Sequence, residues 1–344
     1  AARGAEGGEA ARAGPEGALP PDRLVRYLGG NVSCRALEAT SLVREACQRH
    51  GCSPTASVAL GRALLGAALL ANGRDAGETL QIRISGSGPC GAIITEATSS
   101  GEGEVALGCR GFVAEPQADA ATVPELVGVD ETATMRVTRT HPFWRSPYTG
   151  TTPLKTGEIA EDIVQYLAVS EQTPASMGLS VDWDNEANRV RHAEGWLVTL
   201  LPGWEDGEVG AVEANIANFG RERDDGRPRP EAICEHLMRE LVGTFQMEEK
   251  VEFQCRCTTS RLLTAIMMFG KQEVADMVAQ GEDVEATCDW CGGSLSVTAE
   301  QIQEHLASDQ GMEQVRTGGY SPRQLRLKEN EMAAMPLPGE AKWT

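Results

Sequence analysis

The chain has 344 residues, which is long enough for a large core and for more than one domain. Its 31 Lys and Arg stand against 50 Asp and Glu, and the formal charge of −19 argues against binding to nucleic acid or to anionic membrane surfaces. No apolar run reaches about eighteen residues, so we expect no membrane partner. Ten irregularly spaced cysteines in a chain of this size predict a reducing compartment, with the cytoplasm as the expected location.

The two ends of the chain have the composition of disordered tails. The segment 1–21 lacks aromatic side chains and is rich in Ala, Gly and Glu, and we expect it and 311–344 to be disordered. Its arginines suggest a transit-peptide remnant, which would place the protein in a plastid stroma or another organelle. Its three glutamates favour a simple tail instead, because transit peptides are poor in acidic residues.

Between these tails, the pattern predicts an α+β fold with an N-terminal sheet-plus-helix domain, a helical linker and a small C-terminal zinc-binding domain. The N-terminal domain is expected over 22–203. Its predicted strands and helices follow, in chain order: a strand over 32–37, a helix capped by Thr40, a buried Ala- and Gly-rich helix from Pro54, strands over 79–85, 88–97, 104–114 and 133–141, a helix over 158–169, and strands over 175–183 and 195–203. The segment GSGPCG is expected to be a turn between two of these strands.

A change of composition marks the expected linker at 204–250. Two amphipathic stretches, over 208–220 and 231–243, are interrupted by glycines and by the charged run RERDDGRPRP. Residues 205–250 contain twelve acidic and six basic residues, a net charge of −6. Such helices are marginal alone, so the segment is either an ordinary packed helical hairpin or a linker of low stability whose order depends on its neighbours.

Four cysteines define the expected C-terminal module at 251–310. Cys255 and Cys257 form a C-x-C pair, and Cys288 and Cys291 form a C-x-x-C pair followed by two glycines. Two close pairs separated by a small folded segment are typical of a structural zinc site, and we predict one Zn²⁺ per chain. Between the pairs we expect a helix capped by Thr258 or Thr259 and a second short helix that carries Val274 and ends at Gly281. After them we expect a short strand at 294–297 and a capping box of Thr298 with Gln301.

The composition of this module and the chemistry of its cysteines indicate the role of the zinc. A nucleic-acid ribbon is disfavoured because residues 251–310 hold ten acidic and three basic residues. Four cysteine ligands leave no open position for catalysis by the metal, and the chain shows no nucleophile or phosphate-loop motif, so we expect no enzyme. Thiolates are both metal ligands and oxidisable groups, which predicts a redox switch. The alternative is a constitutive binding protein whose fold the zinc only stabilises.

The chain resembles the heat shock protein 33 family, the redox-regulated 33 kDa chaperonins, over roughly 22–305. The resemblance rests on VEFQCRC and TCDWCGG, and upstream on SPTASVALGRALLGAALL, ISGSGPCGAI, WLVTLLPG and the stretch from PYTGTTPLKTGEIAEDI to SEQTP. The chain departs from the family pattern at Ala193-Glu194-Gly195, where Ala-Gly-Gly is usual, and at Thr199, where Gln is usual. Neither position touches the predicted metal site, so only local packing is put in doubt.

The resemblance implies an ATP-independent holdase that binds unfolding or aggregation-prone client proteins. In the reduced state the four cysteines would hold zinc and the protein would be a monomer. Oxidation would pair Cys255 with Cys257 and Cys288 with Cys291, release the zinc, unfold the module and the linker, and produce a homodimer. The linker's apolar face would then bind clients, and that face consists of Val212, Ile216, Phe219, Ile233, Leu237 and Leu241. Among the other cysteines, Cys234 stands out because it lies in this linker.

Overall fold

Ten strands form one strongly curved sheet in this computed structural model, which describes residues 19, 21–100, 107–219, 229–241, 243–281 and 283–308. The expected tails and the charged run at 221–228 lie outside these residues, apart from Leu19 and Pro21. The strands, in chain order, are β1 (Arg23–Gly29), β2 (Val32–Glu38), β3 (Thr79–Ser85), β4 (Ala92–Ser99), β5 (Leu107–Val113), β6 (Thr134–Thr140), β7 (Tyr148–Pro153), β8 (Ala175–Asp184), β9 (Arg189–Leu200) and β10 (Thr244–Phe253).

The sheet order places β10, the last of these ten strands in the chain, in the middle. It runs β7-β6-β3-β4-β5-β10-β1-β2-β9-β8, so β10 joins two halves of the sheet. Most of β10 pairs antiparallel with β1, and its last three residues, Val251 to Phe253, pair parallel with β5. All the other strand pairs of this sheet are antiparallel. The chain therefore leaves the sheet at its centre, immediately before Cys255.

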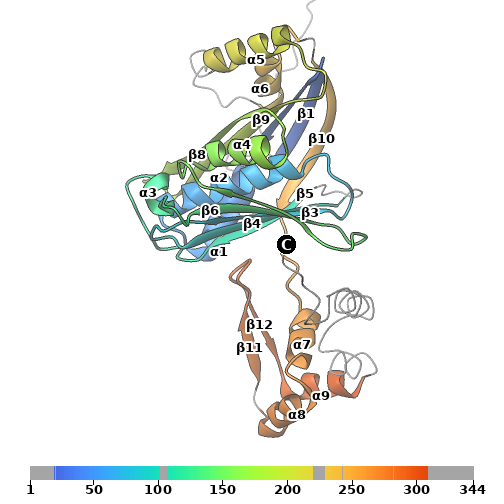
Figure 1. Ribbon diagram of the computed structural model, residues 1–344. Coiled ribbons are helices and arrows are strands. Elements are labelled where there is room, and N and C mark those ends of the chain that lie inside the picture. The colour runs from blue at the N-terminus through green and yellow to red at the C-terminus, as the bar shows by residue number, and fades with distance from the viewer. Residues whose placement is uncertain are drawn as a thin grey trace, which may run out of the picture.

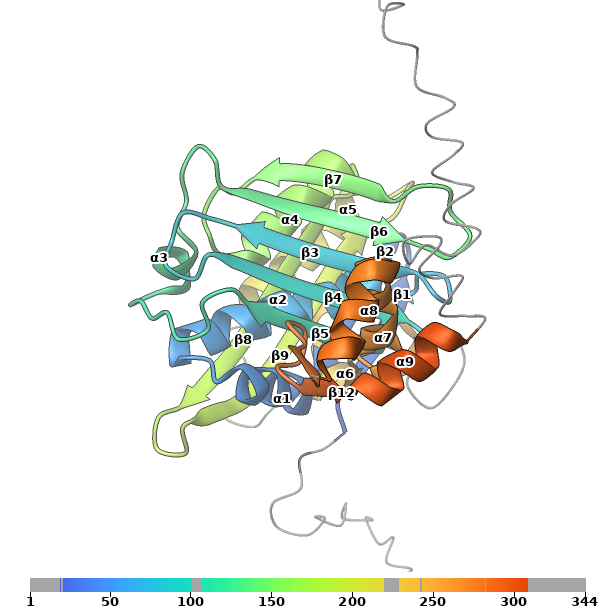
Figure 2. The same cartoon turned by 90° about the horizontal axis from the view of Figure 1, so that it is seen from below.

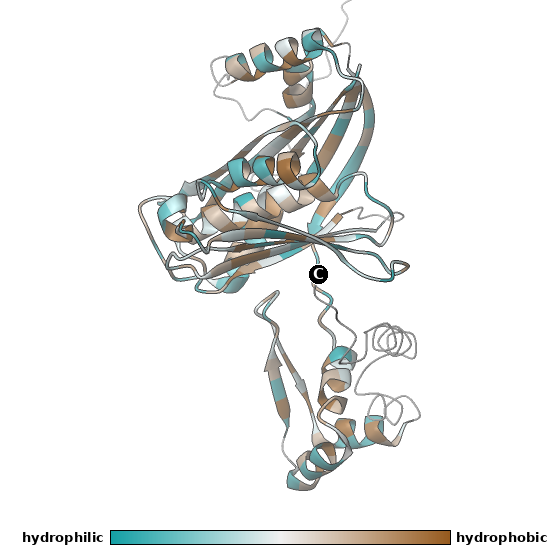
Figure 3. Ribbon diagram, viewed as in Figure 1, coloured by the Kyte–Doolittle hydropathy of each residue, from teal (hydrophilic) through white to brown (hydrophobic). Residues whose placement is uncertain are grey.

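Helices fill the inside of the curve (Figure 1). They are α1 (Thr40–His50), α2 (Pro54–Ala71) and α4 (Ile159–Ser170), and the short helix α3 (Val123–Val127) packs against α2 at the edge of the domain (Figure 2). The central helix α2 packs against strands of both halves, and Figure 3 shows its hydrophobic colouring against them. Length and composition alone would allow α2 to cross a membrane, but 78% of its apolar window is buried inside this domain. Its glycines permit close approach, since a Cβ on Gly61 would lie 2.6 Å from Val43 Cγ1.

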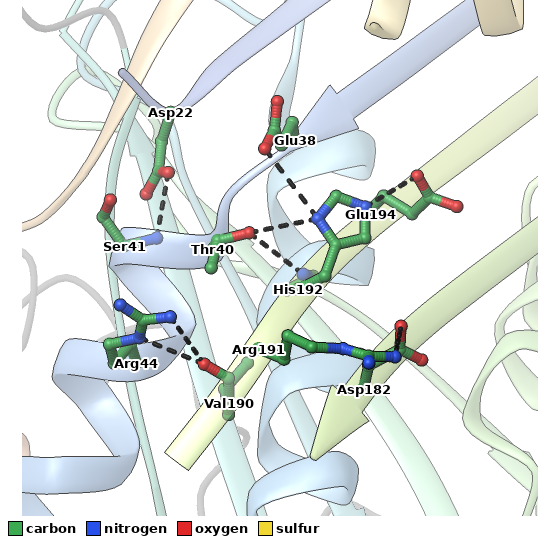
Figure 4. A network of polar contacts seen from close by, with 11 residues as sticks. Asp22, Glu38, Thr40, Ser41, Arg44, Asp182, Val190, Arg191, His192 and Glu194 are labelled. Carbon is green, nitrogen blue, oxygen red and sulfur yellow. Dashed lines mark hydrogen bonds and ion pairs between the residues drawn. The ribbon is translucent and has the colours of Figure 1, made fainter. Parts of the chain in front are cut away.

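Polar contacts fix α1 against β9 and the start of β1 (Figure 4). The Asp22 carboxylate accepts hydrogen bonds from the backbone N–H groups of Ser41 and Leu42, at 3.0 and 2.5 Å, and so caps the helix. Thr40 Oγ1 accepts from the Ala193 N–H and lies 3.4 Å from His192 Nδ1. Further along α1, Arg44 donates to the Val190 carbonyl oxygen at 2.8 Å. The helix is therefore anchored along one side.

The predicted α+β class is confirmed, together with most of the predicted helices and strands. The antiparallel pairing of β3 with β4 confirms the GSGPCG turn, and Ser53 caps α2 by accepting a hydrogen bond from the Ala56 N–H. Within the predicted N-terminal domain, the strands β1 and β7 were not expected. Both belong to pairings that become visible only when the sheet is assembled.

The largest difference from the prediction lies at 244–250. This segment was expected to end the helical linker, but it forms the first part of β10. The sequence TFQMEEKVEF alternates apolar and polar residues, but its glutamates and lysine make it look like a charged surface segment. Before it, α5 (Asp206–Phe219) and α6 (Pro230–Leu237) are helices, as predicted. They lie on the outer face of the sheet, over β1, β2 and β9.

The C-terminal module lies on the opposite side of the main domain from α5 and α6, as Figures 1 and 2 show. It comprises α7 (Thr259–Met267), α8 (Lys271–Gln280), β11 (Val284–Thr287), β12 (Ser294–Val297) and α9 (Ala299–Ala307). Thr258 caps α7, and Thr298 with Gln301 forms the predicted capping box at α9. The module's own core has five fully buried apolar side chains, Ile266, Met267, Val274, Val297 and Ile302. A core of that size is too small to stabilise such a unit alone.

Candidate metal centre

Two separate segments bring the four cysteines together. Cys255 and Cys257 follow β10 directly, and Cys288 and Cys291 lie in the turn between β11 and β12. The ligand atoms of all four lie within 4.8 Å of one another. The convergence predicted from the C-x-C and C-x-x-C spacing is therefore present in the fold.

The sulfur separations fit a metal rather than disulfide bonds. The distance from Cys255 Sγ to Cys288 Sγ is 3.7 Å, and that from Cys257 Sγ to Cys291 Sγ is 3.4 Å. Zn–S bonds of about 2.3 Å in a tetrahedron place sulfurs about 3.8 Å apart, whereas a disulfide requires about 2.05 Å. Four thiol ligands are also the donor set of structural zinc sites. These residues would hold Zn²⁺ with no position left for a catalytic water.

The thiols differ in how readily they ionise. Burial raises the pKa of Cys255, but the Cys257 N–H and the three neighbouring thiols donate hydrogen bonds that lower it to about 7. A hydrogen bond with Cys291, together with burial, raises the pKa of Cys257 to about 12. Cys255 thus forms a thiolate more readily than Cys257.

The centre is partly open to solvent. Cys291 is buried and the other three ligands are half-buried. A cleft of about 250 Å³ reaches Cys257 and Cys288, and its walls include Arg110, Arg261 and Trp290. Small oxidants therefore have access to the sulfurs.

The turn that carries Cys288 and Cys291 is built by backbone hydrogen bonds. The Gly292 N–H donates to the Cys288 carbonyl oxygen at 2.8 Å, and the Cys288 N–H donates to the Gly293 carbonyl oxygen at 2.9 Å. Gly292 has a φ of 64°, a left-handed conformation that side chains disfavour. The glycines after the cysteines thus close this turn, which we call the zinc knuckle (288–293).

Trp290 docks the zinc knuckle on the main domain. Its ring lies 4.2 Å from the Arg110 guanidinium and makes an edge contact with Phe112, with ring centroids 5.4 Å apart. Both partners belong to β5. Sequence reasoning missed this role, although a tryptophan between two ligands of a polar module was a signal.

The C-terminal end of α1 supports the zinc knuckle from a second side. His50 Nε2 lies 3.3 Å from the Trp290 carbonyl oxygen. A Cβ on Gly292 would lie 2.7 Å from the Arg49 carbonyl oxygen, so glycine is required by close approach as well as by conformation. On the other cysteine pair, Arg256 donates a hydrogen bond to Thr98 Oγ1 on β4.

Two arginines line the cleft at the thiols. Arg261 comes from the module, and Arg110 comes from the main domain, where Glu96 pairs with it at 2.7 Å. Arg110 reaches this cleft only through the docking of the two units.

The six residues predicted to bind clients lie together between α5–α6 and the sheet. Ile233 and Leu237 are fully buried, Val212 is 5% exposed, and the other three are half-buried. They pack on Val25, Val32, Cys34, Ala36 and Val198 of the sheet. In this state the apolar face of the linker is covered.

α5 is attached more weakly than α6. Only Val212 and Asn215 of its fourteen residues are buried, and an apolar cleft of about 470 Å³ remains between α5 and the strands β8 and β9. Asn215 holds the two helices together by donating to the carbonyl oxygens of Leu237 and Arg239, at 3.2 and 2.8 Å. α6 is tied to β1 by a two-pronged Arg23–Glu231 ion pair.

Comparison with known proteins is consistent with this site and fold. A family model described as Hsp33 protein matches residues 22–298. A protein of Shouchella clausii named "33 kDa chaperonin" is 34% identical over 288 residues, covering 80% of this chain and 94% of the relative. A Thermus thermophilus protein of the same name is 35% identical over 306 residues, covering 83% and 86%.

A solved structure is also similar. The crystal structure of a 33 kDa chaperonin, a heat shock protein 33 homolog from Thermotoga maritima, superposes with a TM-score of 0.69 and 28% identity. The match covers 82% of this chain and 97% of that one.

Proposed function

The chain belongs to the Hsp33 family of chaperones, and we propose on that premise that it is a redox-regulated, ATP-independent holdase for unfolding proteins. The observation that carries the proposal is the position of the four thiols. The first two follow the central strand β10 directly in the chain. That strand in turn follows two helices, α5 and α6, that cover an apolar face of the sheet.

In the reduced state, the four cysteines hold the module in its folded form. Bound Zn²⁺ supplies binding energy, about 10–16 kcal/mol in small zinc peptides, that the five-residue core does not. Ten irregularly spaced cysteines in a chain of this size support a reducing compartment such as the cytoplasm. A monomer is the proposed resting form.

Oxidation by a peroxide is the proposed trigger. A thiolate attacks one peroxide oxygen and becomes a sulfenic acid while hydroxide leaves, and a second thiolate displaces a second hydroxide from that sulfur. Each disulfide thus consumes one peroxide and, after protonation, releases two waters. We propose the pairs Cys255–Cys257 and Cys288–Cys291.

Chain connectivity supports this pairing, which the family resemblance implies. The nearest sulfurs in the folded centre belong to different pairs, Cys255 with Cys288 and Cys257 with Cys291. Once metal binding is lost, those residues are separated by 33 and 34 positions, whereas the partners within each motif are two or three positions apart. Loop-closure entropy therefore favours the local disulfides.

Unfolding of the module would then reach the linker through β10. Loss of the knuckle removes the Trp290 contacts, and only three residues of β10 pair with β5. The other end of β10 adjoins α6. Release of these helices would expose the six client-binding residues and the apolar sheet face beneath them, rimmed by acidic side chains that keep the open form soluble. The exposed face would also support a homodimer.

The decisive experiment follows zinc, exposed apolar surface and client protection in one preparation. Reduced protein is expected to carry about one zinc per chain and to let a heat-unfolded client aggregate. Peroxide at mild heat should release the zinc, increase the fluorescence of an apolar-surface dye, produce dimers and suppress aggregation. If zinc stays bound, or leaves without any gain in client protection, the metal only stabilises the fold of a constitutive binding protein and the holdase proposal is wrong.

A helix-propensity pair tests the role of α5. Gly210 lies inside α5, and no atom lies within 4 Å of the place its Cβ would take. Gly210→Ala should stabilise the helix by about 0.5–1 kcal/mol and slow the dye response to a fixed peroxide dose about two- to fivefold. The matched variant Ala214→Gly, at an exposed position of the same helix, should accelerate it. Equal rates of the dye response in both variants and the wild type would show that the stability of α5 does not control the exposure of apolar surface.

A further inference from the structure

A second pair of thiols lies in the main domain, at the C-terminal end of α1. Helix α1 ends in a Schellman motif: the Cys52 N–H donates to the Cys47 carbonyl oxygen at 3.0 Å, and the Gly51 N–H donates to that of Gln48 at 3.3 Å. Gly51 has the left-handed conformation that this motif requires, with a φ of 61°. The motif ordinarily brings into contact the side chains at the two positions that Cys47 and Cys52 occupy.

The two sulfurs have different environments. Cys47 is buried, with its sulfur 3.7 Å from the Ser57 carbonyl oxygen, whereas Cys52 is partly exposed. A hydrogen bond between the two thiols raises the pKa of Cys47, which burial raises further, and lowers that of Cys52. The accessible thiol is thus the better nucleophile and the buried one stays protonated beside it.

Both thiols line one cavity. It has a volume of about 520 Å³, much larger than the ~30 Å³ that a water molecule occupies in the liquid. Its walls include two arginines, Arg44 and Arg189, against the single carboxylate of Asp119. A small polar oxidant has room there.

We propose that Cys47 and Cys52 form a second redox site, at which a peroxide oxidises Cys52 and Cys47 then closes an intramolecular disulfide. The Cys52 thiolate attacks one peroxide oxygen, the O–O bond breaks, and hydroxide leaves a sulfenic acid behind. The Cys47 sulfur attacks the Cys52 sulfur, loses its proton and displaces the second hydroxide. One peroxide is reduced to two waters, and two thiols become one disulfide.

The bridged turn also touches the metal centre. Arg49 and His50 lie between the two cysteines, and they contact Gly292 and Trp290 of the zinc knuckle. The disulfide would therefore form in the segment that supports the knuckle. The site does not depend on the holdase proposal, because it shares no sulfur with the metal centre.

Disulfide mapping on the full-length, zinc-loaded protein tests the site. The reduced protein is treated with hydrogen peroxide, its remaining thiols are alkylated, and it is digested with trypsin. Cleavage after Arg44, Arg49 and Arg62 puts the two cysteines on different peptides, 45–49 and 50–62. We expect these peptides joined by a disulfide. Both thiols remaining alkylated, in samples whose metal-centre cysteines are oxidised, would overturn the proposal without touching the holdase function.

Two variants assign the roles of the sulfurs. In Cys47→Ser, Cys52 should be trapped as a sulfenic acid by dimedone, because its resolving partner is missing. In Cys52→Ser, Cys47 should label at least about tenfold more slowly, because it is buried and protonated. Faster labelling of Cys47 would contradict the assignment. Cys109 of β5 is the internal control: its side chain is fully buried in the core of the main domain, and it should stay reduced.

Discussion

Removal of zinc from the reduced protein is expected to unfold the C-terminal module while the ten-stranded sheet stays folded. The module's core holds only five fully buried apolar side chains, and its two cysteine segments converge at the metal centre. The loss of about 10–16 kcal/mol of metal binding exceeds what such a core supplies. Hydrogen exchange after chelation should show loss of protection over 259–307 and retained protection in α2.

A serine variant gives the same result without a chelator. Cys291→Ser removes the most buried ligand, and we expect zinc binding to be lost and exchange over 259–307 to rise to that of an unfolded chain. Cys52→Ser is the matched control, since it also replaces a thiol but does not belong to the metal centre, and it should keep both zinc and protection. A module that stays protected without zinc would show that its packing alone suffices.

Shortening Leu237 in α6 is expected to release the linker without any oxidant. The side chain is fully buried against the sheet, and a buried Leu→Ala change costs about 2–5 kcal/mol. Because α5 adds only two buried residues, little other buried surface holds the two helices on the sheet. Reduced Leu237→Ala protein should therefore bind an apolar-surface dye and suppress client aggregation while its zinc is still bound.

The control for this variant lies on the same helix. Glu235 is exposed on α6, and Glu235→Ala should leave dye binding and client aggregation at the wild-type level. Should Leu237→Ala lower the melting temperature yet gain neither dye binding nor client protection in the reduced state, the covered face under α5 and α6 is not the client surface.

Local signals predicted the elements whose pattern is complete within a short window. The buried helix from Pro54, the turn between β3 and β4, and the capping box of Thr298 with Gln301 were all predictable, because neighbouring residues decide them. β10 was not. Its partner β1 lies more than 200 positions away, as the pairing of Leu28 with Thr244 shows, and charged residues mask its alternation.

The metal centre also has a part that the sequence predicted and a part that it did not. Spacing alone predicted which four cysteines would converge, since each pair is held together by its own turn. The docking of Trp290 depended on Arg110 and Phe112, which follow from the sheet and not from the module. The Cys47–Cys52 contact had a local cause, the glycine that ends α1, but read singly these cysteines resemble small buried hydrophobes.

The central place of β10 has a consequence for how the protein is made. β9 ends at Leu200, and β10 is complete only at Phe253, so a ribosome adding about 5–20 residues per second needs roughly 3–10 s to cover the gap. During that time β1 and β5 have no partner on the sides that β10 later occupies, and the nascent chain presents two open strand edges. Cys255, the first of the four clustered cysteines, follows two residues after the strand that closes them. Synthesis therefore completes β10 before the set of four cysteines, so the main domain can close before a metal binds.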